Sequence, residues 1–542
     1  MKELIVSRYI RWAVSLFLGI GVFLFWNVAY PQTMNYQEQN QLFLFTADYL
    51  MERISVAGGL ADYVSEFIVQ FYYIPWVGAL LLALLFVIIQ YLVGILLSRV
   101  GRNGFILSLV PPVLLLAYMG DIHVLLSFPV AWMFALLVTV GMGNRWRVAD
   151  VCVIPLLYWL VGPAAWVYVW CRMLVFGWKW GWAALYLLAV QWLASVSMLQ
   201  QWPLESVMNG LNYYFISKQT PAMQHVIVLS VPLLLLLARW LEKMNSHRNW
   251  LWGMQLVLVA MIAFVSIGRS YDDDLHELLM QDKLVREGKW TEIIQRAEKH
   301  QVKTAFSSNC VNLALAQRRQ LADRMFTFYQ SGEDALIMPR MRDNMSAFPT
   351  MEVFWKLGMV NSCLRYASDL QESILNARKS GRLTQRIIEC HLVNGNYPIA
   401  QKHIDLLKKS LFYRDWAERM ETMLGNETLI DNDRVLGKVR KYRFKNDFLY
   451  NYEEIEKMMG ILFVGNPENK MALDYFMGSM LLKGNVQGFG QYMSWVQQYG
   501  GYPSMPMGYQ DVMKCIQAEG NVPGSPYAAY VKRMMNEKGG NR

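Results

Sequence analysis

The stretch IPWVGALLLALLFVIIQYLVGILLSR, residues 74–99, decides the fold of the first half of the chain. Residues 74–97 contain no charged side chain. A helix of that length is long enough to cross the roughly 30 Å hydrocarbon core of a bilayer. No soluble domain has a core large enough to bury repeated runs of this kind. The stretch therefore predicts a membrane-spanning helix.

Similar apolar runs recur through the first half and then stop. Residues 1–268 contain 24 of the 93 Asp, Glu, Lys and Arg residues, and residues 269–542 contain the other 69. We therefore predict an all-α protein with two domains: a transmembrane bundle of about nine helices at 1–268 and a soluble helical domain at 269–542. The predicted spans are 12–30, 74–97, 105–119, 122–140, 148–161, 164–176, 181–199, 222–241 and 250–268.

The charges between the spans predict the orientation of the chain. The first span follows basic residues and no A-x-A cleavage site follows it, so it is predicted to be a signal anchor with a cytoplasmic N-terminus. Cations gather on alternate connections, which predicts those connections to be cytoplasmic. The inner cations are Lys2, Arg8, Arg11, Arg99, Arg102, Arg145, Arg147, Lys179, Arg239, Lys243 and Arg248. The outer loops carry Arg53 and Lys218 against Glu38, Asp48, Glu52, Asp62, Glu66, Asp121 and Glu205.

The number of spans depends on residues 148–176. Two short helices meeting at Gly162 and Pro163 would form a hairpin, whereas one kinked helix would reverse the orientation of everything that follows. Cations precede the stretch and also end it, with Arg172 and Lys179 at its end, which favours the hairpin. Nine spans place the C-terminal domain outside the cytoplasm, which for a bacterial inner-membrane protein means the periplasm.

The second half has apolar residues at helical spacing, separated by short turns with glycine. Two turns share the form Gly-x-aromatic-x2-small: Gly288 with Trp290, and Gly395 with Tyr397 and Ala400. A degenerate third instance is predicted at 467–493. This pattern resembles tetratricopeptide-type repeats, which implies a concave surface for a protein or peptide, with Tyr397 as a binding residue. An irregular helical domain is the alternative. Segments 499–509 and 523–542 are predicted to be connectors.

Residues 31–73 form the first predicted outer loop, read as two amphipathic helices separated by Gly58 and Gly59. No P-loop, GxGxxG, GxSxG or HExxH motif is present. The arrangement of a helical first outer loop with acids, a second loop Gly-Asp-Ile-His at 120–123 and an outer C-terminal domain is similar to that of the lipid-dependent glycosyltransferases of the C superfamily.

That resemblance implies roles for specific residues. Glu38 or Asp48 would activate the acceptor, Asp121 and His123 would hold a divalent cation or the phosphate end of the donor, and Glu205 would be a further binding residue. The alternative is that each acid is an ordinary charge at the membrane interface.

Other features restrict the partners. Six cysteines without a CxxC spacing argue against zinc and against a disulfide framework. The basic stretch Lys438, Arg440, Lys441, Arg443 and Lys445 suits a lipid headgroup or a solvated face better than nucleic acid, which we do not expect as a partner. Membrane lipids and a protein or peptide are the expected partners.

Three functions remain open from the sequence. The first is a membrane-anchored interaction module in envelope assembly, and the second is a lipid-linked-sugar glycosyltransferase. The third is a transporter, for which the intramembrane polar residues Gln90, Gln191, His225 and Gln255 are candidates. The chain as a whole resembles uncharacterised bacterial envelope proteins that join a multi-span half to a tetratricopeptide-like half.

Overall fold

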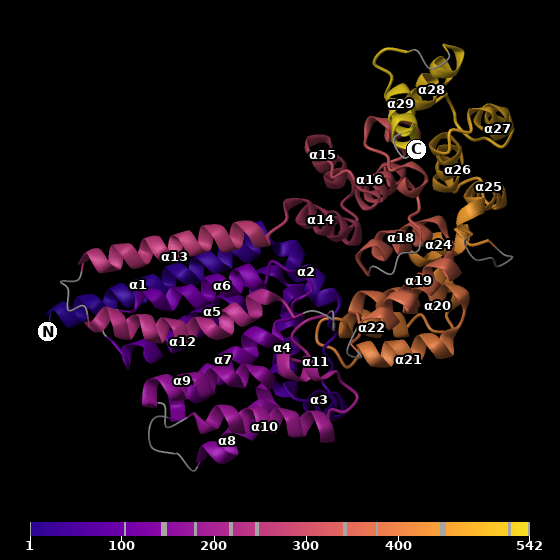
Figure 1. The fold of residues 1–542 in the computed structure, drawn as a ribbon. Helices are drawn as coiled ribbons and strands as arrows, with labels where there is room; N and C mark the ends of the chain where they lie inside the picture. The colour runs from indigo at the N-terminus through magenta and orange to yellow at the C-terminus, as the bar shows by residue number, and fades with distance from the viewer. Residues whose placement is uncertain are drawn as a thin grey trace. The chain divides into compact units, whose positions relative to one another are not determined.

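The computed structural model is all-helical (Figure 1). It describes residues 2–101, 104–142, 149–177, 181–215, 220–243, 249–339, 344–374, 378–444, 451–518 and 522–539. Within these ranges there is no β-strand, and the single β-bridge joins Val124 and Tyr214. Several cations on which the topology prediction depends lie outside the described residues: Arg102, Arg145, Arg147, Lys179, Lys218 and Arg248. Lys445 of the basic stretch also lies outside them.

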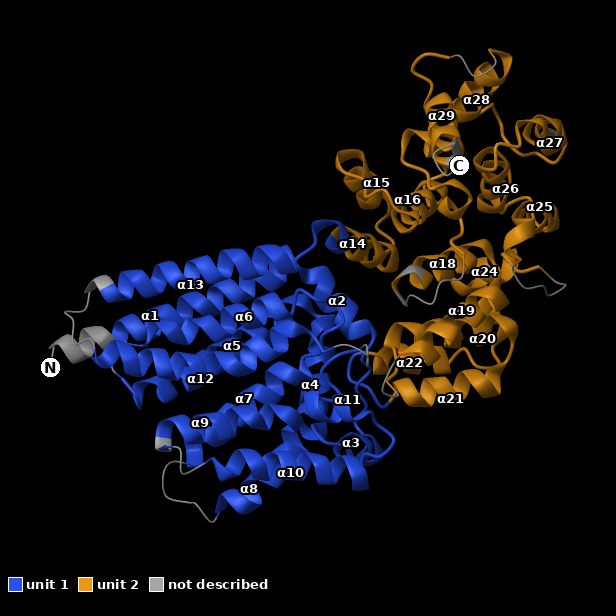
Figure 2. Cartoon of the chain, in the orientation of Figure 1, with its two compact units in different colours: residues 1–276, 409–412 blue, residues 277–408, 413–542 orange. Residues whose placement is uncertain are grey.

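The chain divides into two compact units (Figure 2). Unit 1 comprises residues 1–276 and 409–412, and unit 2 comprises residues 277–408 and 413–542. The division at 276 lies a few residues beyond the domain boundary predicted at 268, within the first helix after the last apolar segment.

Unit 1 contains five helical segments long and apolar enough to cross a membrane, by length and composition. They are Tyr9–Ala29, Pro75–Ser98, Ala149–Val175, Ala222–Lys243 and Leu251–Ser270. The third of these is one segment by length and composition only, because the chain reverses within it at Gly162. Three shorter apolar helices are Ile106–Tyr118, Ser127–Met142 and Trp182–Ser197. Each predicted span therefore corresponds to apolar helix, but several of the helices are shorter than the roughly 20 residues that an upright crossing requires.

The principal helices of unit 1 are α1 (Lys2–Leu24), α5 (Pro75–Ser98), α6 (Val110–Tyr118), α7 (Ser127–Met142), α8 (Ala149–Val161), α9 (Trp166–Phe176), α10 (Trp182–Ser197), α12 (Ala222–Lys243) and α13 (Asn249–Ser270). Helix α1 packs on α5, α13 on α6, and α12 on both α6 and α9. Gln90 accepts a hydrogen bond from Ser15 at 2.6 Å and donates one to Ser108 at 2.8 Å. This predicted transporter residue therefore joins packed helices.

Residues 149–176 form a hairpin. Gly162 has φ +68°, a left-handed conformation that breaks the helix between α8 and α9. The carboxylate of Asp150 lies 2.9 Å from Arg172 and also accepts a hydrogen bond from Tyr168. In one straight helix residues 150 and 172 would be about 33 Å apart. The ion pair therefore requires the chain to reverse at Gly162, as the flanking cations predict.

The turn of this hairpin lies beside the predicted first outer loop. Gly58 donates its backbone N–H to Trp159 at 2.9 Å, and the indole of Trp159 donates to Ile54 at 3.1 Å. Three short helices make up that loop, α2 (Pro31–Gln39), α3 (Ala47–Ile54) and α4 (Gly59–Val69). The sequence predicted two helices here, and only the break at Gly58 and Gly59 was placed correctly.

Unit 2 consists of consecutive helices connected by short turns. They are α14 (Asp273–Glu287), which begins in unit 1, α15 (Trp290–Lys299), α16 (Ala305–Gln317), α17 (Leu321–Arg324), α18 (Asn344–Leu357), α19 (Val360–Ser373), α20 (Gly381–Asn394), α21 (Tyr397–Leu407), α22 (Arg414–Glu421), α23 (Glu427–Asn432), α24 (Leu436–Tyr442), α25 (Ile455–Gly465), α26 (Lys470–Leu482), α27 (Val486–Gln498), α28 (Met507–Gln517) and α29 (Pro526–Gly539). Helix α29 occupies most of the predicted C-terminal connector.

One turn geometry recurs along unit 2. A residue in the left-handed conformation ends a helix, and the next residue donates its N–H to the carbonyl five positions earlier, as in a Schellman motif. The six bonds measure 2.8 to 3.0 Å and join Lys289 to Leu284, Gln320 to Leu315, Met359 to Phe354, Asn396 to His391, Asn485 to Met480, and Gly501 to Val496.

The first four of these turns are regularly spaced. Their left-handed residues are Gly288, Arg319, Gly358 and Gly395, at intervals of 31, 39 and 37 residues. Successive helices in this region pack on one another, with α15 on α16, α18 on α19, α19 on α20, and α20 on α21. The sequence pattern alone identified Gly288 and Gly395 and missed the two turns between them.

Candidate functional site

Four of the predicted site residues, Glu38, Asp121, His123 and Glu205, lie on segments that come together at one end of unit 1. This is the end where α2, α3 and α11 (Leu204–Asn209) are found in Figure 1. Helix α2 begins at Pro31, a favourable first helical residue. Its Gln37 donates from Nε2 to the carbonyls of Ile122 and Val124, at 2.7 and 2.9 Å. Glu38 is the neighbouring residue, and the segment that carries it is therefore fixed to the loop of Asp121 and His123.

That loop also pairs with residues 213–215. Phe215 donates its backbone N–H to His123 at 2.8 Å, and Leu125 donates to Tyr213 at 3.0 Å. The hydroxyl of Tyr214 donates to Asp121 Oδ2 at 2.9 Å. The His123 ring packs edge-on against the ring of Tyr214, with centroids 6.0 Å apart. Tyr214, which the sequence did not indicate, therefore connects two predicted residues.

Glu205, on α11, lies close to Tyr214. It lies at a small cavity that is also lined by Trp202, Asn209, Tyr213, Tyr214 and Gln224. We call this cavity the Tyr214 pocket. Since Tyr214 lines the pocket and also donates a hydrogen bond to Asp121, the structure brings Glu205, Asp121 and His123 into one neighbourhood.

The two predicted acceptor-activating acids differ in their surroundings. Glu38 is buried, with 3% of its surface exposed. Asp48 is exposed in the first turn of α3. No group of three or more His, Cys, Asp or Glu side chains that could hold a metal ion occurs among the described residues. The cation site at Asp121 and His123 therefore remains a prediction from two residues.

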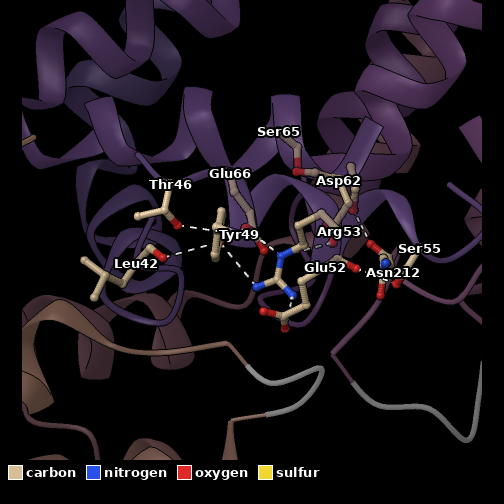
Figure 3. A network of polar contacts seen from close by, with 11 residues as sticks. Leu42, Thr46, Tyr49, Glu52, Arg53, Ser55, Asp62, Ser65, Glu66 and Asn212 are labelled. Atoms are coloured by element: carbon tan, nitrogen blue, oxygen red, sulfur yellow. Dashed lines mark hydrogen bonds and ion pairs between the residues drawn. The ribbon is translucent and has the colours of Figure 1, made fainter. Parts of the chain in front are cut away.

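A buried ion cluster lies in the predicted outer loop (Figure 3). Arg53 from α3 lies 3.1 Å from Glu66 and 4.0 Å from Asp62, both on α4 and both fully buried. Tyr49 donates its hydroxyl to Glu66. Burial opposes ionisation of Arg53, but the neighbouring carboxylates of Glu66 and Asp62 raise its pKa above the ordinary value. The guanidinium therefore stays charged and joins α3 to α4.

The sequence contained a signal for this cluster. Tyr49 and Arg53 are four residues apart, as are Asp62 and Glu66, so each pair shares one face of its helix. With Gly58 and Gly59 allowing the chain to reverse, the two faces can meet. From the sequence, Asp62 and Glu66 count only as acids of the outer loops, whereas the structure buries both side chains.

Tyr397, the predicted binding residue of unit 2, lies at the start of α21. It follows Gly395, which has φ +75° and ends α20, and Ala400 is fully buried, as the turn pattern predicts. The Tyr397 hydroxyl donates to Glu427. The tyrosine therefore joins α21 to α23 at the surface of unit 2.

Helices α14, α18 and α20 of unit 2 are joined by pairs of opposite charges. Asp282 on α14 binds Arg382 on α20 at 2.8 Å, and Glu352 on α18 binds Arg386 on α20 at 2.7 Å. Burial opposes ionisation of Glu352, but Arg386 and Arg382 lower its pKa below the usual range. Burial raises the pKa of Glu389, which binds Arg386 from the same helix. These charges stabilise one another across the stack of helices.

Two cations of the basic stretch of unit 2, Arg440 and Lys441, are paired with acids. Arg440 binds Glu427 at 2.5 Å and Asp431 at 3.0 Å. Lys441 binds Glu468 at 2.6 Å. These pairs join α24 to α23 and to the segment before α26.

These features define the protein as an all-helical chain that combines membrane-capable helices with a stack of helix pairs. It belongs to the family of unknown function DUF6057, which matches residues 8–536. The expected membership of an uncharacterised family is therefore confirmed. Comparisons with curated proteins and with solved structures found no match.

Proposed function

We propose that this chain is a nine-pass membrane protein that presents a tetratricopeptide-like helical domain outside the cytoplasm, where it binds a protein segment during assembly of a bacterial envelope. The observation that carries the proposal is the recurring turn at intervals of 31, 39 and 37 residues. Repeats of about 34 residues with this turn stack into surfaces that bind extended peptides.

The hairpin of α8 and α9 supports the proposed topology. Its two halves add an even number of passes, so the chain leaves the last span on the side opposite its N-terminus. Contacts of Gly58 with Trp159 and of Ile54 with Trp159 agree with this, because the hairpin turn and the first loop must then share one side of the membrane.

Exposed apolar residues near Tyr397 are the proposed docking surface. Ile399 on α21 and Leu429 on α23 are each 44% exposed, and the bond from Tyr397 to Glu427 joins these two helices. The inner helices α16, α18 and α20 are covered along almost all of their length. The partner is therefore proposed to contact the second helices of the pairs.

Two experiments test the proposal with the full chain in membranes. A protease-cleavable tag after the last residue should be accessible only from the periplasmic side, and access only from the cytosol would reject the topology. A photo-crosslinking residue at position 399 or 429 should then capture one defined partner that the same residue at Lys457, an exposed site on α25, does not capture. Equal capture at all three sites would reject the docking surface.

A glycosyltransferase remains the second candidate, favoured by one observation: Asp121, His123 and Glu205 gather around Tyr214. Acids at a bilayer edge can act as bases or hold a cation beside a lipid phosphate. Transfer of a radiolabelled sugar from a lipid carrier by the purified chain, lost in Asp121→Asn, would support it. Transfer that is unchanged in that variant would reject the assigned role of Asp121.

A further inference from the structure

The Tyr214 pocket has the chemistry of a site for a cationic group. Glu205 forms no ion pair among the described residues, and its side chain is exposed at the cavity. No lysine or arginine is among the described residues that line the cavity. Asp121 does not line the cavity, but it accepts a hydrogen bond from the hydroxyl of Tyr214, which does. The local charge of the described residues is therefore negative.

One buried hydrogen-bond acceptor, the side-chain oxygen of Gln224, belongs to a residue that lines the pocket. Gln224 is only 4% exposed, and its Nε2 donates to the carbonyl of Asn209 at 2.6 Å. That bond fixes the orientation of the amide, because exchanging its nitrogen and oxygen would place two oxygens together. The Oε1 atom of Gln224 has no hydrogen-bond partner among the described residues. A buried acceptor left in this state destabilises the folded chain, and a ligand that donates a hydrogen bond to it would recover that free energy.

Trp202 adds a further requirement for the ligand. Its indole N–H is also buried without a partner among the described residues. The ligand that satisfies the pocket therefore presents N–H donors for Glu205 and Gln224 and an oxygen acceptor for Trp202. The indole ring also offers an aromatic face, which attracts cations.

The size of the cavity limits which cationic groups can enter it. Its enclosed part accommodates one water-sized group. A primary ammonium has that size, whereas a trimethylammonium group or a sugar ring does not fit. The ligand therefore inserts a primary ammonium and keeps the rest of its structure outside.

The flanking helices indicate where such a ligand comes from. Helix α10, just before the pocket in the chain, exposes Leu193 and Val196, and α12, just after it, exposes Val226 and Leu229. These apolar side chains suit acyl chains if the helices lie in a bilayer, as proposed above. Tryptophan and tyrosine are also the residues enriched at the level of lipid headgroups.

We propose that the Tyr214 pocket binds the ethanolamine headgroup of a phospholipid. Glu205 and Gln224 accept hydrogen bonds from the primary ammonium, and Trp202 donates to a phosphate oxygen. The proposal goes beyond the interaction function, since it concerns unit 1 alone and requires only that α10 and α12 lie in a membrane.

The test uses the full chain, purified in detergent and freed of lipid, with short-chain phosphatidylethanolamine added and bound lipid counted by native mass spectrometry. The unmodified chain should bind it. Glu205→Gln and Gln224→Met should each weaken binding about tenfold or more, as expected for the loss of a charge-assisted or buried hydrogen bond. The matched control Glu52→Gln, which removes an exposed acid of the first loop, should leave binding unchanged.

Two further ligands distinguish the sources of the ammonium. Phosphatidylcholine, which lacks N–H donors, should bind at least tenfold more weakly, and N-acetyl-lysine methylamide should not displace the lipid at equal concentration. Equal binding of the two lipids, or unchanged binding in both pocket variants, would overturn the site. Displacement by the lysine derivative would overturn the lipid as its ligand and point to a peptide. Thermal unfolding of each variant shows that a loss of binding is not a loss of fold.

Discussion

Replacing glycine by alanine at two equivalent turns of unit 2, at Gly358 and Gly395, should lower the stability of the fold by different amounts. Gly358 and Gly395 have φ +80° and +75°, and each is followed by the same hydrogen bond across the turn. Alanine at either position pays the left-handed strain, about 1 kcal/mol after the smaller entropy of the unfolded chain is counted. At Gly395 an added Cβ meets nothing within 4 Å, whereas at Gly358 it would lie 2.7 Å from the Cβ of Tyr442.

Overpacking of that kind costs about 1–3 kcal/mol more. Thermal unfolding of the full chain in detergent, with limited proteolysis to assign the transition of unit 2, measures the difference. Gly395→Ala should lower Tm by roughly 2–4 °C and Gly358→Ala by at least twice as much. Gly395→Asn should recover part of the loss, because asparagine tolerates the left-handed region. Equal shifts for the two alanine variants would refute the packing of Gly358 on Tyr442.

Three further predictions concern single groups. Arg319 occupies a turn position where the others have glycine, with φ +56°, so Arg319→Gly should raise Tm by about 1–3 °C in the same assay. Burial raises the pKa of Asp474 to about 7, although a hydrogen bond from Tyr502 opposes the shift. The folded state then keeps a proton that the unfolded state loses above about pH 4, so stability falls as pH rises toward 7, by up to about 4 kcal/mol. Asp474→Asn should raise Tm at pH 8 and not at pH 4, and an equal effect at both values would exclude this titration. Arg172→Met should lower the free energy of unfolding by about 3–5 kcal/mol, because it leaves Asp150 buried and unpaired. Adding Asp150→Asn should restore most of that stability. Additive losses in the double variant would show that the pair does not hold the hairpin.

The long apolar helices could be predicted because their signal is local. Helices α5, α12 and α13 lie where hydropathy placed spans. The hairpin of α8 and α9 could also be predicted, from Gly162 and the cations at both ends. Its internal ion pair could not, because Asp150 and Arg172 read individually as charges at the membrane surface, and only the reversal of the chain brings them together.

The spacing of the turns in unit 2 could not be predicted, because two of the four turns have the same backbone conformation but different residue types at the positions of the motif. At Gly358 the aromatic position holds Val360 and the small position holds Cys363. At Arg319 the glycine itself is replaced, and leucine stands at the aromatic position. A motif made of residue types cannot detect these turns, whereas the hydrogen bond across each turn is unchanged. The interval of 107 residues between Gly288 and Gly395 is thus divided by two further turns of the same geometry, at Arg319 and Gly358.

The buried cluster of α3 and α4 changes the physical basis of the predicted orientation. Asp62 and Glu66 were counted among the acids of the outer side, and Arg53 was one of its two cations. All three charges are enclosed by the fold and neutralise one another in large part, so they contribute little to the field at the membrane surface. Acidic residues have little influence on topology in any case, and cations close to the spans dominate it. With Arg53 paired internally, the described part of the predicted outer loops retains no free cation, so the predicted contrast with Arg11, Arg99 and Arg239, which are assigned to the inner side, becomes sharper.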